Sequence, residues 1–526
     1  MATQSTKPRL SVAMIVRNEQ DVLAETLDSI HSIADEVLVL DTGSTDQTAT
    51  LAAEWGATVI HTPWPNDFSA ARNQLLADAR GDWILWLDAG ERLAAGSGKI
   101  LRQFVEEQAD PEAIYYLMVE VPAAAPSGYA EQAARPRLMP RNPGLRFEGP
   151  VGESVRASAE AAGLKTAPAP VRILCHPRRN DPRRKAAKAW RDLRMIAAYR
   201  AQGNPLRPRL LVTLGEAYVN FTQPILAELA FVQAVRTAPK GSTEMLEGYY
   251  GLLTALAFDP TQRDRQLLAC TEALEVYPFD VQLLCAVGGY LQARGRLDLA
   301  ERSFRLAVQF GQVDTETWHL VDIAELGASC LGLALQLQGK DDEACEVLSE
   351  ALQRSPYSQR LRRQLVDLEI KHGRDDEAIR SAEALAEGSD ARHWLSESAA
   401  GACKAARQLW DEAIAHLQGA YTAGCRDPLC LRWLSVAMLS AGRHEAAELV
   451  VREWHRLEPA NHEAKTYLSV LQNRPRVPQG EAETPRVEHD RPRRIRFDAA
   501  QSLTEAVLAP MPVVSRRSTL DAGVES

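Results

Sequence analysis

Three polar clusters in the first hundred residues carry side chains of the types that bind ligands. They are Arg17-Asn18-Glu19, Asp41 to Asp46 and Asp88 to Glu91, and the apolar runs that they follow are rich in β-forming residues. Such runs predict strands that are covered on both faces of a sheet. Ligands of open α/β sheets bind at the carboxyl ends of the strands. The three clusters therefore lie where a sheet of this kind would hold its ligand.

The elements that must position these clusters alternate up to about residue 175. Strands are expected at Leu10–Val16, Glu36–Leu40, Ala57–His61 and Trp83–Leu87, and helices at Asp21–Ser32, from Asp46 to about Trp55, and at Phe68–Ala79. The order strand, helix, strand, helix predicts a Rossmann-like, mostly parallel sheet with right-handed crossovers. We place this α/β domain at residues 1–195.

A different period begins near residue 205. A turn glycine followed by charged residues and then alanine recurs at Gly339, Gly373 and Gly442, and the first two of these are 34 residues apart. A helix–turn–helix repeat of this length is the tetratricopeptide signature. The first unit has Leu214-Gly215, Tyr218, Ala227, Phe231, Ala234 and Pro239 in the expected order. We expect an all-α solenoid of about seven units at 205–472, one of them (about 242–280) degenerate.

Composition excludes several classes of protein. The chain has 526 residues, of which 45% are hydrophobic and 25% charged, with a net charge of −10. This balance gives no global basic field for nucleic acid or anionic lipid. No apolar run is long enough to span a membrane, and Met1 to Leu10 lacks the apolar core of a secretory signal. We therefore expect a cytoplasmic protein.

The cysteines and the last segment carry no recognisable site. None of the eight cysteines forms a CxxC pair, so a zinc site is not expected. Residues 473–526 mix arginine with proline and acidic residues and hold too little apolar surface to offset the entropy of ordering, so we expect a disordered tail. The chain also lacks the GxxxxGK[ST], GxSxG, GxGxxG and HExxH motifs of other enzyme classes.

Four N-terminal motifs resemble glycosyltransferase family 2, and in particular its bacterial branch with C-terminal tetratricopeptide repeats. The motifs are Met14-Ile-Val-Arg-Asn-Glu19, Val39-Leu-Asp-Thr-Gly-Ser-Thr-Asp46, Trp64-Pro-Asn-Asp-Phe-Ser-Ala-Ala-Arg-Asn73 and Gly81-Asp-Trp-Ile-Leu-Trp-Leu-Asp88. The resemblance covers roughly the first 195 residues. It implies a GT-A fold, a nucleotide-sugar donor (usually a UDP-sugar), a divalent Mn²⁺ or Mg²⁺ and inversion at the sugar carbon.

The resemblance also implies roles for individual residues. It makes Asn18, Glu19, Asp41, Arg72 and Asp88 contacts of the nucleotide sugar. A carboxylate-held metal would neutralise the diphosphate as the glycosidic bond breaks, and a carboxylate on the opposite face of the sugar would take the acceptor proton. We therefore expect Asp88 to anchor the metal or the diphosphate and Glu153 to be the base.

Two departures from the family pattern bear on the metal. The family's Asp-x-Asp-Glu is here Asp88-Ala89-Gly90-Glu91, without the second aspartate, and the histidine of its F-x-G-x-x-H-E stretch is Gly152. The remaining candidate ligands are Asp88, Glu91 and His176, the last of which lies in a stretch that resembles the family's I-x-H element. Three outcomes stay open: an enzyme with altered metal use, a metal-independent enzyme, or a nucleotide-binding fold without catalysis.

Two functions from different classes follow. In the first, the chain moves a sugar from a nucleotide sugar to an acceptor. Stacked helix pairs form an extended concave surface, which favours a protein or peptide held by the repeats, while glycan and lipid-linked acceptors stay open. In the second, a degenerate transferase domain sits on a repeat scaffold for protein–protein interaction. The joint presence of Asn18, Glu19, Asp41 and Arg72 argues for the first, and the two departures support the second.

Overall fold

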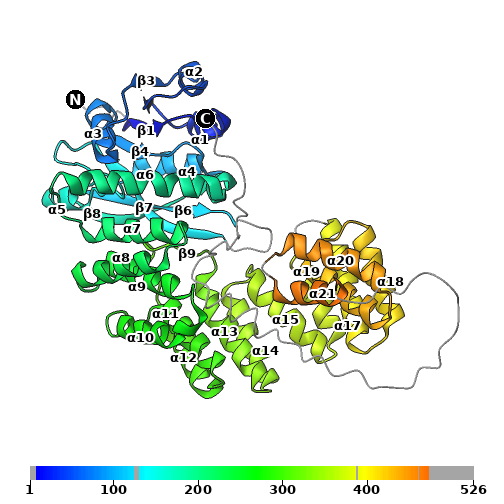
Figure 1. Ribbon diagram of the computed structural model, residues 1–526. Coiled ribbons are helices and arrows are strands. Elements are labelled where there is room, and N and C mark those ends of the chain that lie inside the picture. Colours follow the sequence, from blue (N-terminus) through cyan, green and yellow to red (C-terminus); the bar gives the residue numbers. More distant parts are fainter. Residues whose placement is uncertain (1–6, 124–129, 387–388, 460, 473–526) are drawn as a thin grey trace, which may run out of the picture.

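The computed structural model describes residues 7–123, 130–386, 389–459 and 461–472. The tail expected at 473–526 lies outside these residues. The described part has an N-terminal sheet with covering helices, followed by a curved series of helices (Figure 1). No helix in it has the length and apolar character needed to cross a membrane.

One sheet forms the N-terminal half, in the strand order β3-β2-β1-β4-β7-β6-β8-β5, with β9 added on β7. Strands β1 to β4 are mutually parallel, as the alternation predicts, and β7 pairs antiparallel with both β4 and β6. The strands are β1 (Leu10–Val16), β2 (Glu36–Asp41), β3 (Thr58–His61), β4 (Trp83–Trp86), β5 (Glu91–Leu93), β6 (Ala113–Val121), β7 (Glu131–Pro140), β8 (Lys165–Cys175) and β9 (His319–Leu320). The sheet is thus mixed, with its parallel part at the β1 side.

Helices cover both faces of the sheet. One buried core lies beneath α1 (Gln20–Ile30), α2 (Thr48–Glu54) and α4 (Ser97–Glu107), and a second lies beneath α3 (Phe68–Asp78) and α5 (Arg156–Ala161). Strands β1 and β4 are buried almost throughout, which explains their continuous apolar runs. The long helix α6 (Pro182–Ala201) leads from the sheet to the repeats.

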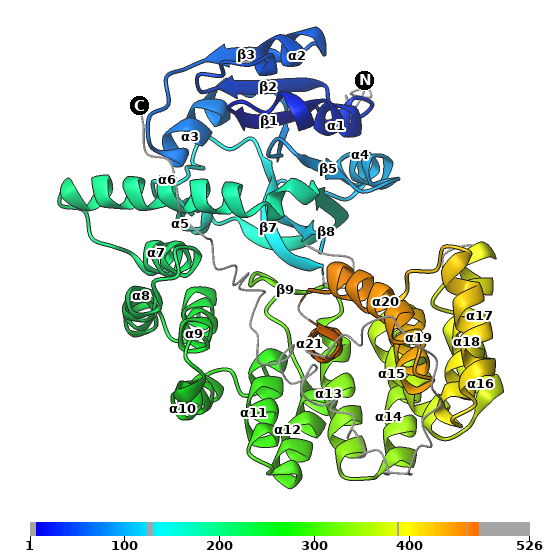
Figure 2. The same ribbon diagram turned by 45° about the vertical axis from the view of Figure 1, so that its right-hand side comes forward.

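In the described part of the repeat region, seven consecutive helix pairs follow one another along an arc (Figure 2). They are α7 (Pro208–Asn220), α8 (Pro224–Thr237), α9 (Thr243–Leu256), α10 (Arg263–Leu274), α11 (Val281–Ala293), α12 (Leu297–Phe310), α13 (Ile323–Leu337), α14 (Asp341–Arg354), α15 (Gln359–Lys371), α16 (Asp375–Glu383), α17 (Ser389–Ala406), α18 (Trp410–Thr422), α19 (Pro428–Ser440) and α20 (His444–Leu457); α21 (His462–Gln472) follows. The degenerate stretch at about 242–280 holds the pair α9 and α10.

The repeat signature has a packing cause. A Cβ atom at Gly215 would lie 2.5 Å from the ring of Phe231, and one at Gly288 would lie 2.3 Å from the ring of Phe304. The first helix of each of these pairs therefore needs a glycine where the aromatic ring of the second helix packs. This explains why glycine and a large apolar residue recur at a fixed spacing.

One segment of the repeat region returns to the sheet. Between α12 and α13, the strand β9 pairs antiparallel with β7, and the Ala134 amide donates to the Thr315 carbonyl at 2.6 Å. Trp318 packs against the core beneath α1 and α4. The sheet and the repeats are thus joined by hydrogen bonds and apolar contacts as well as by the chain.

Candidate active site

The loops that follow β1 and β2 are folded onto each other. Asn18 has a left-handed backbone, with φ of 54°, and its side-chain oxygen accepts from the Thr45 amide at 2.8 Å. The Asn18 amide in turn donates to the Ser44 hydroxyl at 3.0 Å. These hydrogen bonds hold the first two polar clusters together at the carboxyl edge of the parallel strands, as the sequence predicts.

Asp41 ends β2 beneath this loop pair. Its side chain accepts from the Ser44 amide at 3.0 Å and lies 3.1 Å from Nδ1 of His61, at the end of the neighbouring strand. The residue is 3% exposed. Oδ1 of this buried carboxylate thus faces the Ser44 amide and Oδ2 faces the His61 ring.

Glu19 faces basic residues that come after β8. Its carboxylate forms an ion pair with Arg178 and lies 3.9 Å from Arg184. Burial and the charge of Arg184 lower the pKa of Arg178 to about 10, so this guanidinium stays charged at neutral pH. The predicted nucleotide contact is therefore part of an ionic cluster.

Arg72 brings the two predicted catalytic carboxylates together. Its Nε donates to Glu153 at 2.6 Å, and its Nη2 lies 3.6 Å from Oδ1 of Asp88. The guanidinium also lies over the rings of Trp86 and Phe147, at 4.8 and 5.3 Å. Three separate sequence motifs thus converge on one partly buried arginine.

Helix α3 also holds the loop that carries Glu153. The Asn73 side chain donates to the Phe147 carbonyl at 3.0 Å and accepts from the Phe147 amide at 2.8 Å. Ser69 donates to the Gly149 carbonyl at 2.6 Å. Arg72 and Glu153 are therefore positioned by the same helix and by the loop fastened to it.

Arg137, to which no role was assigned from the sequence, contacts both carboxylates of the third cluster, those of Asp88 and Glu91. Its Nη2 lies 2.6 Å from Glu91 and 3.4 Å from Oδ2 of Asp88, while its Nε is buried without a hydrogen-bond partner among the described residues. Burial alone would raise the pKa of Asp88, but the charges of Arg137 and Arg72 outweigh it and hold that pKa well below its ordinary range. Asp88 is consequently ionised at neutral pH.

Glu91 points into the protein. It is 2% exposed, accepts from the Asp88 amide at 3.0 Å and lies 3.7 Å from Arg179. Burial is the largest influence on its pKa and raises it. Glu91, a candidate metal ligand from the sequence, is thus paired with groups inside the protein.

His176 lies beside the third cluster. Its amide donates to the Gly90 carbonyl at 2.7 Å, and its Nδ1 accepts from the Arg178 amide at 3.2 Å. The imidazole therefore caps the short helical turn Pro177–Asn180.

The predicted ligands do not fit a divalent metal. Asp88 faces guanidinium groups on both of its oxygens, and Glu91 is buried against Arg137. Throughout the part of the chain that the structure describes, no group of three or more His, Cys, Asp or Glu side chains has the geometry to hold a metal ion. Mg²⁺ and Mn²⁺ are held by carboxylate oxygens together with phosphate and water oxygens, and here both carboxylates are already paired with guanidinium groups.

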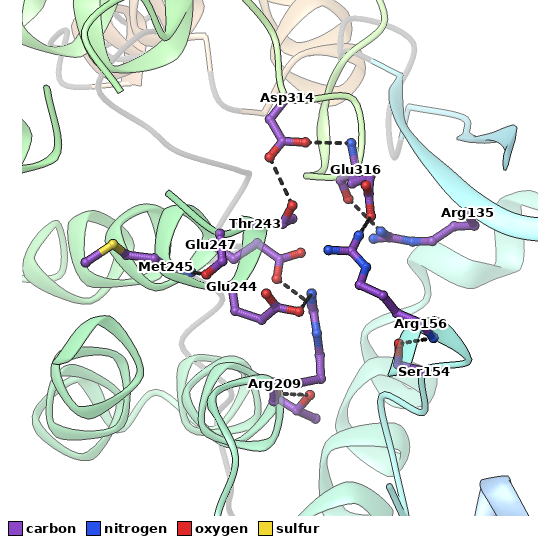
Figure 3. A network of polar contacts seen from close by, with 12 residues as sticks. Arg135, Ser154, Arg156, Arg209, Thr243, Glu244, Met245, Glu247, Asp314 and Glu316 are labelled. Atoms are coloured by element: carbon purple, nitrogen blue, oxygen red, sulfur yellow. Dashed lines mark hydrogen bonds and ion pairs between the residues drawn. The ribbon is translucent and has the colours of Figure 1, made fainter. Parts of the chain in front are cut away.

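The first repeat supports the Glu153 loop from below. A Cβ atom at Gly152 would lie 3.2 Å from both Arg209 and Thr213 of α7. Arg209 is in turn held by Glu244, at 3.1 Å, and by Glu247, both on α9 (Figure 3). The repeat region therefore fixes the position of the loop that carries the predicted base.

Comparison with known proteins identifies the class of the N-terminal domain. Residues 11–110 match the family described as Glycosyl transferase family 2. The N-terminal part of the chain therefore carries a domain of this transferase family, and the resemblance found in the sequence is confirmed. Tetratricopeptide-type helix pairs follow the domain.

Two curated relatives and one solved structure illustrate the match. A TPR repeat-containing protein of Synechococcus elongatus is 42% identical over 147 residues, which is 28% of this chain and 35% of that protein. An uncharacterized glycosyltransferase of Rickettsia bellii is 35% identical over 86 residues, 16% of this chain and 29% of the relative. The matches thus span about a third of these relatives' lengths. The glucosyl-3-phosphoglycerate synthase of Mycobacterium tuberculosis, solved with Mn²⁺ and UDP, is 25% identical with a TM-score of 0.18, over 22% of this chain and 43% of that one.

Proposed function

We propose that the chain is an inverting glycosyltransferase that takes its sugar from a nucleotide-sugar donor, in the first place a UDP-sugar. The observation that carries the proposal is the bridge that Arg72 forms between Glu153 and Asp88, at 2.6 and 3.6 Å. One guanidinium thereby joins the predicted base to the predicted diphosphate side of the site. A protein or peptide that lies along the repeats is the acceptor that we propose.

The reaction assigns a task to each of these groups. The acceptor hydroxyl oxygen forms a bond to the anomeric carbon while the bond from that carbon to the diphosphate oxygen breaks, and its electron pair stays on the diphosphate. Glu153 accepts the proton of the hydroxyl. Asp41 and Asn18 hold the nucleoside at the edge of β1 and β2, where their side chains are fixed by the Ser44 and Thr45 amides.

Titration of UDP into the purified protein tests the proposal. We expect binding by the unaltered chain and a loss of at least about tenfold in affinity for Asp41→Ala, because a buried carboxylate that accepts ligand hydrogen bonds contributes about 1.5–3 kcal/mol. Asp78→Ala, at the exposed end of α3, is the control and should bind normally. Absence of binding to UDP and to GDP would refute the proposal and favour the repeat scaffold.

A further inference from the structure

Where the family motif has its second aspartate, this chain has Gly90, and the guanidinium group of Arg178 lies nearby. A Cβ atom at Gly90 would lie 3.4 Å from Cγ2 of Val22 and 3.7 Å from the guanidinium nitrogen Nη2 of Arg178. Gly90 itself has φ of 87°, a left-handed conformation that disfavours any side chain. The second carboxylate of the family motif is thus absent from this chain, and the backbone at its position favours glycine.

The third cluster is instead rich in guanidinium groups. Arg72, Arg137 and Arg179 surround Asp88 and Glu91, while Arg178 and Arg184 lie beside Glu19. Around the third cluster, three guanidinium groups therefore meet three carboxylates, those of Asp88, Glu91 and Glu153. A divalent cation that approached Asp88 would meet two guanidinium groups within 4 Å of its oxygens.

We propose that Arg72, Arg137 and Arg179 neutralise the departing diphosphate directly, in the role that a divalent metal has in the family. The inference rests on the proposed function. Arg137 keeps a buried Nε that has no partner among the described residues, although this side chain is only 9% exposed. A donor of this kind is satisfied when an anion reaches it.

When the donor binds, Arg72 and Arg137 exchange the Asp88 carboxylate for the diphosphate. The contacts of Asp88 with Arg72 and Arg137, at 3.6 and 3.4 Å, are longer than the 2.6 Å contact of Arg137 with Glu91. Diphosphate oxygens carry more charge than one carboxylate and accept more hydrogen bonds, so they displace Asp88 from these donors. As the bond to the anomeric carbon breaks, the charge that develops on the diphosphate oxygen meets guanidinium N–H groups that are already in place.

Calorimetric titration of UDP into protein stripped with EDTA, with and without added Mn²⁺, tests the inference. We expect the affinity to agree within about twofold between the two conditions, and Mn²⁺ alone to give no binding heat. If UDP binds only when Mn²⁺ is present, the proposed function stands and the inference is wrong. If UDP binds under neither condition, the proposed function itself fails.

Variants separate the arginines from general charge effects. Arg179→Gln should weaken UDP binding by about tenfold and leave uridine binding unchanged, because a charge-assisted hydrogen bond to the diphosphate is lost and uridine has no diphosphate. Arg137→Lys keeps a positive charge beside buried Glu91 and serves as the second variant. Arg172→Gln, on the exposed face of β8 beside Glu120, is the matched control. Equal affinities for UDP in Arg179→Gln, Arg137→Lys and the control would overturn the inference.

Discussion

An ionic network lies between the sheet and the first repeats, in which Arg135 of β7 and Arg209 of α7 act on Glu247 of α9. Through Glu247, this network makes the stability of the protein depend on pH. Burial raises the pKa of Glu247 to about 7, although the charges of Arg209 and Arg135 act in the opposite direction. Glu216 and Glu244 are the further charged groups that face it, and both raise its pKa. The side chain is 10% exposed, so solvent screens these interactions little.

The sign of the effect follows from linkage. A carboxyl group that titrates near pH 7 in the folded protein and near pH 4.5 in the unfolded chain holds its proton more tightly when folded, by about 3 kcal/mol. Below about pH 4.5 the group is protonated in both states. Between about pH 4.5 and about pH 7 only the folded state keeps the proton, so the free energy of unfolding falls as the pH rises.

Glu247→Gln removes this titration while it preserves the shape of the side chain. Near pH 5 we expect the variant and the unaltered protein to have similar free energies of unfolding. Near pH 8 the variant should be more stable by about 3 kcal/mol, because its neutral amide avoids the cost of burying the ionised Glu247 carboxylate. Urea denaturation followed by circular dichroism across this range measures the difference.

The test uses the difference in free energy of unfolding between Glu247→Gln and the unaltered protein, because other groups titrate in the same pH range. Burial also raises the pKa of Asp280, to about 6, and this adds a slope of the same sign to both proteins. Glu228→Gln, in the surface ion pair with Arg265, is the control and should show no pH-dependent difference. A constant difference between Glu247→Gln and the unaltered chain, or stabilisation only at acidic pH, would refute the reasoning.

Glycines provide three further predictions, all measured by urea denaturation. Gly81→Ala should destabilise the sheet by about 1–3 kcal/mol, because its Cβ would lie 2.7 Å from the Ser11 amide nitrogen and 2.9 Å from the Arg9 carbonyl; unchanged stability would contradict the close approach. Gly215→Ala should destabilise the first repeat by a similar amount, because its Cβ would lie 2.5 Å from the Phe231 ring; unchanged stability would contradict this close packing. Gly419→Ala, inside α18 with no atom within 4 Å of the added carbon, should instead stabilise by about 0.5–1 kcal/mol, and a loss there would point to an unrecognised contact.

Local patterns predicted the parts of the fold that local physics determines. The runs at β1, β2 and β4 are apolar because both faces of these strands are buried, and this leaves a direct trace in the sequence. The repeats were predictable because glycine recurs where a large side chain of the paired helix packs, as at Gly215, Gly288 and Gly332. The short strands β5 and β9 leave no such trace, because pairing with distant β8 and β7 defines them.

The candidate site likewise contains residues that the sequence identifies and residues that only the structure reveals. Asp41, Arg72 and Asp88 stand in motifs and were named from the sequence, and the structure brings Arg72 and Asp88 together. Arg137 and Arg179 were missed as site residues because an isolated arginine has no periodic signal. Their acidic partner, Glu91, lies 46 residues from Arg137 and 88 from Arg179, in another segment of the sheet. Only the folded chain shows which carboxylates these arginines neutralise.

The contact between the two halves bears on why the repeats belong to the same chain as the transferase domain. Trp318, in the segment that adds β9 to the sheet, lies beneath the guanidinium groups of Arg135 and Arg179, at 5.1 and 5.5 Å. Arg179 in turn reaches Glu91 in the third polar cluster. A side chain of the repeat region thus positions a cation of the site, while Arg209 of the first repeat supports the loop of Glu153. The site therefore has contacts with the repeat region on two sides, through Arg179 and through the Glu153 loop.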